Sequence, residues 1–186
     1  MPSFARAVRN VFWWGSLGLG VLQLSSCSSM PVRAFADQRP IFDPIKFWSG
    51  RTRSSGVMET RGGAPMQTVR TETHGHFEGD IFHLEQDLTF GGGKRSHRSW
   101  RMRRIDAHHF IATANDMVGE ARGEAWGNAF HWSFTLALSR GNPLSHVRMS
   151  QWMYLQPDGR TLLNHTTIRK AGFVVAQVTE QFQPVP

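Results

Sequence analysis

The chain has 186 residues, of which 40% are hydrophobic, and its 21 Lys and Arg against 14 Asp and Glu give a net charge of +7. This length is typical of one domain, and the presence of 13 Phe and 7 Trp excludes a disordered chain. The single cysteine excludes a disulfide framework within the chain.

The N-terminal residues have the features of a bacterial signal peptide. Arg6 and Arg9 precede an apolar stretch at residues 11–24, which is shorter than the roughly 20 residues that span a bilayer. The Leu-Ser-Ser-Cys sequence that ends at Cys27 resembles a lipobox. We therefore predict that residues 1–26 are a lipoprotein signal peptide and that Cys27 is lipidated, which anchors the chain in a membrane. The alternative is a free cysteine near an uncleaved anchor or a non-lipid cleavage site.

The next residues indicate the location and the domain boundaries. Ser28 stands where an Asp would mark inner-membrane retention in enterobacteria, so the lipobox resemblance implies the periplasmic face of the bacterial outer membrane. Residues 27–40 show little apolar periodicity, and we expect the lipidated Cys and a tether there. Residues 41–186 then form the folded domain. We expect no nucleic-acid partner for a lipid-anchored periplasmic protein, and the oligomeric state is not indicated.

Past the tether the domain reads as a succession of strands. Apolar and polar residues alternate with period two, and only residues 43–48 predict a helical turn. Such a run of hairpins removes its free edges by closing on itself. We therefore predict an all-β fold, an antiparallel up-and-down, lipocalin-like barrel of about nine or ten strands. The predicted strands cover residues 52–60, 69–78, 81–90, 96–105, 108–113, 117–125, 130–139, 147–155, 162–170 and 173–182.

Two tight turns, Gly79-Asp80 and Asp158-Gly159, predict the register of two hairpins. The first hairpin then has one apolar face and one polar face. Its inward residues are Phe82, Leu84, Leu88 and Phe90, and its outward residues are His83, Glu85 and Asp87. In the second hairpin, Trp152 lies opposite His165 and Met153 lies opposite Asn164.

Several short motifs occur in an order that resembles one known family. Behind the lipobox they are Phe47-Trp48-Ser49-Gly50, Arg98-Ser99-Trp100, Gly127-Asn128-Ala129, Trp152-Met153-Tyr154-Leu155, Leu163-Asn164-His165 and Lys170-Ala171-Gly172. The set resembles the proteobacterial lipoprotein family catalogued as domain of unknown function 3833, over about residues 41–182. The resemblance implies the location and the fold, and it implies no activity because the family has none established. The chain departs from the expected pattern at Gln151 and at residues 91–93, so no role for an acid is carried over to these places.

Histidines on one strand face give the sharpest chemical hypothesis. His74, His76, His83 and Glu85 share that face, and three imidazoles with a carboxylate are a plausible metal set. The alternative, which we favour, is the solvated outside of a barrel, and we expect no metal and no other cofactor. Nucleophilic catalysis lacks a motif, because the cysteine is assigned to lipid and no G-x-S-x-G elbow occurs. Residues 91–94 lack the P-loop pattern and read as a hairpin loop.

The stretch 94–104 interleaves cations with an aromatic residue. On a strand, Arg98 and Trp100 share one side, while Arg101 and Arg103 share the other. We interpret it as a solvated cationic strand. Two alternatives remain open: contact with anionic headgroups or lipopolysaccharide phosphates, and an Arg98 that turns inward to meet the carboxylate of a ligand.

The aromatic residues admit two interpretations, a packed barrel core and a cavity for one apolar ligand. If a cavity exists, we expect the ligand against the alternating residues Phe130, Trp132, Phe134 and Leu136. The predicted ligand-binding residues are Trp132, Phe134, Trp100, Trp152, Asn128, Asn164 and Arg98. Glu85 and Lys170 are further polar candidates for the cavity wall.

These observations predict a binding or envelope-maintenance protein for an apolar or amphipathic, lipid-like molecule. A second hypothesis is a cavity enzyme of proton-transfer or hydratase type, in which Glu85 is the acid or base. A third is an envelope assembly partner without a cavity. An internal pocket separates the first two hypotheses from the third, and a carboxylate in that pocket favours the enzyme.

Overall fold

The structure is a computed structural model that describes residues 29–139 and 141–186. The predicted signal peptide and Cys27 lie outside the described residues. Two short helices precede the strands, η1 (Val32–Phe35) and α1 (Pro44–Trp48), and a third, η2 (Pro143–Ser145), lies between β7 and β8. The strands are β1 (Gly50–Thr60), β2 (Pro65–Glu78), β3 (Ile81–Phe90), β4 (Arg95–Arg104), β5 (His109–Ala114), β6 (Met117–Trp126), β7 (Ala129–Ala137), β8 (His146–Leu155), β9 (Leu162–Lys170) and β10 (Phe173–Pro184).

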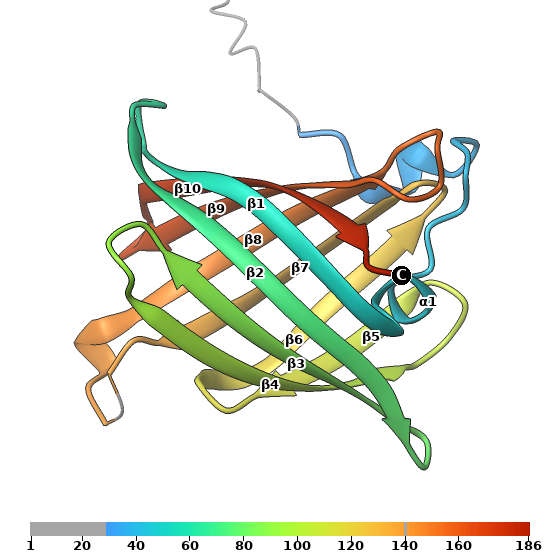
Figure 1. Cartoon of the computed structure of the whole chain (residues 1–186), viewed down its shortest axis with the longest axis horizontal. Coiled ribbons are helices and arrows are strands. Elements are labelled where there is room, and N and C mark those ends of the chain that lie inside the picture. Colours follow the sequence, from blue (N-terminus) through green and yellow to red (C-terminus); the bar gives the residue numbers. More distant parts are fainter. Residues whose placement is uncertain (1–28, 140) are drawn as a thin grey trace, which may run out of the picture.

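The strands form one closed antiparallel barrel (Figure 1). Each strand pairs with its neighbours in the sequence, and β1 pairs with β10 to complete the closure. The predicted all-β, up-and-down barrel is therefore confirmed, with ten strands. No helix in the described ranges is long and apolar enough to cross a membrane.

Both predicted hairpin registers are confirmed. In the β2–β3 hairpin, Gly75 pairs with Leu84 and His76 pairs with His83. In the β8–β9 hairpin, Trp152 pairs with His165 and Met153 pairs with Asn164. Phe82 and Leu84 are buried inside the barrel as expected, whereas Leu88 and Phe90 at the far end of β3 are only half-buried.

Helix α1 covers one end of the barrel, which we call the helix end. The helix begins where the Asp43 carboxylate accepts hydrogen bonds from the backbone N–H groups of Ile45 and Lys46, a common way to satisfy free amides at a helix start. Its last residue, Trp48, packs edge-on against Phe182 of β10. The opposite end carries the β1–β2, β3–β4, β5–β6, β7–β8 and β9–β10 connections, and we call it the loop end.

Part of the segment predicted as a tether packs on the barrel. Val32 is buried, and the ring of Phe35 contacts those of Trp152 and Tyr154 on the outer face of β8. The Phe35 carbonyl lies so close to Gly127 that a Cβ there would fall 1.7 Å from it. The expectation of a free tether up to residue 40 is thus corrected for residues 32–35, because their apolar side chains find aromatic partners.

Candidate functional site

One side of the barrel interior is aromatic. Trp100 of β4 stacks on Trp132 of β7 with 4.8 Å between ring centroids, and Phe134 meets Trp100 edge-on at 5.1 Å. Phe130 also packs on Trp132, with 5.5 Å between ring centroids. Period-two alternation along β7 places Phe130, Trp132 and Phe134 on the same inner face. These rings form an apolar wall opposite the strands that close the barrel.

The other side of the interior is polar and centres on Glu180 of β10. This side chain is 7% exposed. One carboxylate oxygen accepts hydrogen bonds from the Ser54 hydroxyl at 2.7 Å and the Thr71 hydroxyl at 2.9 Å. The other accepts a longer bond of 3.3 Å from the Asn164 amide. Glu180 is thus held by side chains of β1, β2 and β9, the strands around the closure.

Burial raises the pKa of Glu180 above its ordinary value of 4.5, and the hydrogen bonds from Ser54, Thr71 and Asn164 oppose this rise. The carboxylate has no cation within ion-pair distance in the described chain, and the nearby guanidinium of Arg98 is bound by Asp116. A buried carboxylate without a cation is unfavourable for the fold. Such groups concentrate at functional sites, although structural networks also contain them.

A cavity of about 30 Å³ lies where the polar and aromatic sides meet. Glu180, Gln151, Arg98, Trp100 and Trp132 are among the residues that line it. The volume is enough for one or two water molecules and too small for a lipid-like molecule. Of the two interpretations left open for the aromatic residues, the structure therefore shows the packed interior, with a small polar cavity inside it.

The structure brings most of the predicted ligand-binding residues together. Trp132, Phe134 and Trp100 lie in the aromatic wall, and Asn164 lies beside Glu180. Arg98 turns inward, as one alternative proposed, but its guanidinium makes three hydrogen bonds of 2.8 to 2.9 Å with the Asp116 carboxylate. The carboxylate partner of Arg98 is thus a residue of the chain itself.

Four candidates for the cavity wall lie outside the interior. The placement of three is corrected, whereas the fourth, Glu85, lies outside as the hairpin register predicts. Trp152 is on the outer face of β8, where Phe35 and Tyr154 cover it. Asn128 sits in the β6–β7 turn and donates a hydrogen bond to the Leu155 carbonyl. Lys170 is exposed at the loop end. Glu85 lies on the outer face of β3 and meets His97 at 2.9 Å, because Leu84 occupies the inward position.

The four residues that were considered as a metal set do not converge on one point. His74, His76 and His83 stack side by side, with ring centroids 5.4 and 5.7 Å apart. Glu78 contacts His76 and His83, and Glu85 contacts His97 instead. No group of three or more potential ligands is arranged around one point within residues 29–139 and 141–186. The histidine face is a row of exposed and half-exposed imidazoles on the outside of the barrel.

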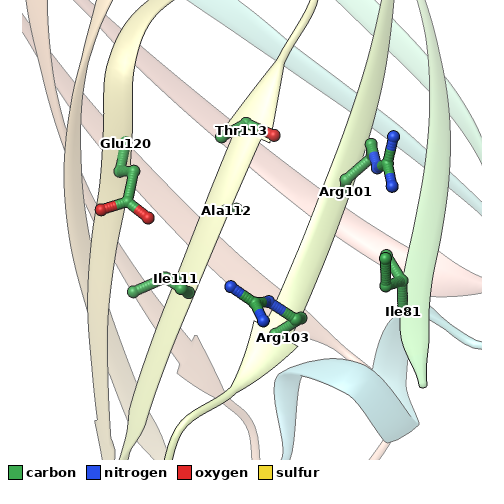
Figure 2. Close-up of a pocket in the computed structure, with 7 residues that line it drawn as sticks. All are labelled: Ile81, Arg101, Arg103, Ile111, Ala112, Thr113 and Glu120. Carbon is green, nitrogen blue, oxygen red and sulfur yellow. The ribbon is translucent and has the colours of Figure 1, made fainter.

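The basic strand β4 alternates as predicted. Trp100 and Met102 are buried inside, whereas Arg101 and Arg103 are exposed on the outer face. Figure 2 shows these two arginines beside a hollow of about 240 Å³ on that face, with Ile111 of β5 between Arg103 and Glu120 of β6. The two guanidinium groups point in different directions in this view, so they do not form a common binding point.

Sequence reasoning missed Glu180, although the sequence contains a signal for it. In β10, Ala176, Val178 and Phe182 occupy alternate positions and point inward. Glu180 continues this apolar alternation as its one acidic member. An acid in the inward phase of a strand predicts a buried carboxylate.

Replacing Glu180 with Gln should remove a pH dependence of stability. Because the pKa of Glu180 is raised in the folded state, the native protein binds more protons than the unfolded chain above pH 4.5, and stability falls as the pH rises through the folded-state pKa. The Glu180→Gln protein should therefore gain stability relative to the wild type as the pH rises above 4.5, as measured by urea unfolding. Glu72→Gln, on the exposed outer face of β2, is the control. A constant difference at all pH values would contradict the prediction.

The closed ten-stranded barrel, capped by a short helix, belongs to the lipocalin-like class of folds. Two solved structures share this fold. A protein of unknown function from the DUF3598 family of Nostoc punctiforme is 14% identical with a TM-score of 0.55, over 80% of this chain and 51% of that protein. The S-type phycobiliprotein lyase CPES of Guillardia theta is 5% identical with a TM-score of 0.53, over 76% of this chain and 91% of that one. The chain thus spans about half the length of the Nostoc protein, and at these identities the likeness shows the fold alone.

The family follows from the sequence. The chain belongs to the family described as Protein of unknown function (DUF3833), whose model matches residues 21–183. This confirms the resemblance carried by the short motifs. No curated protein matches the chain.

Proposed function

We propose that this protein binds a small amphipathic molecule inside the barrel, with the polar part of the ligand at Glu180 and its apolar part against Trp100 and Trp132. The observation that supports this most is the buried Glu180 carboxylate at the wall of the internal cavity. An interior built only for stability would place an apolar side chain there, because burying a charged group without a counter-ion costs free energy.

Binding requires the interior to open. The 30 Å³ cavity is smaller than an amphipathic ligand, so side chains must be displaced when one enters. Inward residues near the loop end, Leu88, Ser96 and Ile168, are only half-buried, whereas α1 covers the helix end. The loop end is therefore the side from which we expect a ligand to enter.

The proposal includes a location. The signal-peptide features of residues 1–26 and the lipobox at Cys27 support a lipoprotein, and Ser28 supports the periplasmic face of the bacterial outer membrane. A lipid-anchored binding protein at that place would take part in maintenance of the envelope.

Native mass spectrometry of the full chain, expressed in a bacterium and extracted in mild detergent, tests both parts. We expect a covalent mass that corresponds to residues 27–186 with acyl groups, and a further non-covalent adduct that denaturing solvent removes. The occupancy of the adduct should fall roughly tenfold or more in Glu180→Gln, because a hydrogen bond to a charged group contributes about 1.5–3 kcal/mol. Glu85→Gln, on the outer face, should leave it unchanged.

Each part has its own contrary result. A chain that retains residues 1–26, or a Cys27→Ala protein that still carries acyl mass, would contradict the anchor. A wild-type protein without any adduct would contradict binding.

A proton-transfer enzyme is the second candidate, and the raised pKa of Glu180 beside the cavity favours it. Glu180 then takes the role that the sequence had assigned to Glu85. The same measurement separates the two candidates. An enzyme would keep or accumulate its substrate as the adduct in Glu180→Gln, whereas a binding protein loses it.

A further inference from the structure

Large apolar side chains are exposed at the loop end. Leu144 in η2 is 82% exposed, Phe173 at the start of β10 is 74% exposed, and Leu138 after β7 is 68% exposed. Single exposed apolar residues are common on protein surfaces. These three are the most exposed large apolar residues of the described chain. They lie in or beside the β7–β8 and β9–β10 connections, which are at the same end of the barrel, at the left of Figure 1.

The strand order makes these tips neighbours along the rim. Strand β8 pairs with both β7 and β9, and β9 pairs with β10. The β7–β8 loop and the β9–β10 turn therefore lie on consecutive hairpins. The β9–β10 turn is held by Ala171 and Gly172, both with positive φ, which is a narrow turn that leaves Phe173 projecting at the edge.

Charge is distributed unevenly between the two ends. The loop-end connections at residues 61–64, 91–94, 138–145 and 171–172 contain no acid. Arg61 and Lys94 lie in two of them and Lys170 precedes a third. The remaining loop-end connection contains Asp116, whose carboxylate is bound by Arg98. At the helix end, by contrast, the turns of three hairpins carry Asp80, Asp106 and Asp158, and Arg160 is the one Lys or Arg in these three turns.

The cations of the loop end are free to meet an external partner. The ion pairs of arginine and lysine in the described chain involve Arg98, Arg104 and Arg122. Arg61, Lys94 and Lys170 are therefore without a carboxylate partner among the described residues, and all three are exposed.

We propose that the loop end docks on an anionic lipid surface. Apolar tips enter the boundary between headgroups and acyl chains, as apolar residues of interfacial segments do. The surrounding cations are attracted to anionic headgroups over about a Debye length. This proposal goes beyond ligand binding in the interior and does not rest on it.

Hydrogen–deuterium exchange of the full chain with lipid vesicles tests the docking. An N-terminal anchor would hold the chain on any vesicle, so the fraction of bound protein is not informative. The measured quantity is therefore the slowing of amide exchange in each segment of the chain. We expect residues 138–145 and 171–175 to exchange several times more slowly with phosphatidylglycerol vesicles than with phosphatidylcholine vesicles. The difference between the two vesicles should disappear in 1 M NaCl, because the Debye length is then only about 3 Å.

Matched variants at the two ends provide the control. Leu144→Ser with Phe173→Ser should abolish the protection, while Phe77→Ser with Ile105→Ser should preserve it. Phe77 and Ile105 are also exposed apolar residues but lie at the helix end. Both pairs replace exposed side chains, and unchanged unfolding temperatures confirm that the fold is intact.

Three results would overturn the proposal. The first is unchanged hydrogen exchange at the loop end with both kinds of vesicle. This is the result expected if the loop end binds an acidic protein and no lipid. The second is equal slowing with both vesicles. The third is slowing at residues 79–80 and 105–108, which would place the helix end on the membrane.

Discussion

Replacing Trp132 with alanine should lower the free energy of unfolding by about 3–5 kcal/mol. Trp132 is 6% exposed and lies between Trp100, Phe130 and Phe134, so its loss leaves a cavity in the aromatic wall. The indole N–H also donates to the side-chain carbonyl of Gln151, which would lose its donor. Urea unfolding followed by circular dichroism measures the loss.

Trp152→Ala provides the comparison, because Trp152 is only half-buried on the outer face. Its loss should cost less than that of Trp132. The prediction for Trp132 would be contradicted by a stable Trp132→Ala protein that still binds an apolar fluorescent probe, since that combination requires a preformed cavity rather than a packed wall.

Leu84→Ala should cost about 2–5 kcal/mol, whereas Glu85→Ala should cost at most about 1 kcal/mol. Leu84 is 4% exposed inside the barrel and faces the buried Trp100 on the neighbouring strand. Glu85 is its neighbour in sequence but lies on the solvated face beside His97. Thermal and urea unfolding of the two variants compare the faces of one strand directly.

The reverse order of these two costs would mean that β3 is turned over and that the polar face lines the interior. Glu85 would then return as the candidate carboxylate. Because adjacent residues of a strand point to opposite faces, no intermediate arrangement satisfies both side chains.

The register of the hairpins could be predicted because local information determines it. Gly79-Asp80 centres the β2–β3 turn, and the alternation on either side then gives one apolar and one polar face. Closure could be predicted from the absence of helices to cover free edges. The register follows from residues that are close in the sequence, and closure follows from the composition of the whole domain.

The polar cluster could not be predicted in the same way, because it depends on the closure register. Glu180 meets Ser54 and Thr71 only when β10 pairs with β1 in the observed alignment. No turn connects these two strands, so no local pattern indicates which residues face each other. From the sequence, Glu180 could be recognised only as an acid at one of the alternate, otherwise apolar positions of β10.

Trp152 was misplaced for a related reason. Both sides of β8 carry large residues, with Met153 inside and Trp152 outside, so composition alone does not select the inner face. On the outer face, Trp152 and Tyr154 are covered because Phe35 packs on them. That contact comes from a segment that was expected to be a tether.

The pairing of β1 with β10 also determines when this protein can fold. Ser54 and Glu180 are 126 residues apart in the sequence, and contacts of such separation form slowly. Neither the barrel nor its polar cluster can be completed before the last strand has been synthesised. Until then the free edge of β1 and the aromatic interior remain exposed to aggregation. A chain that ends before β10 would therefore have no closed barrel to form.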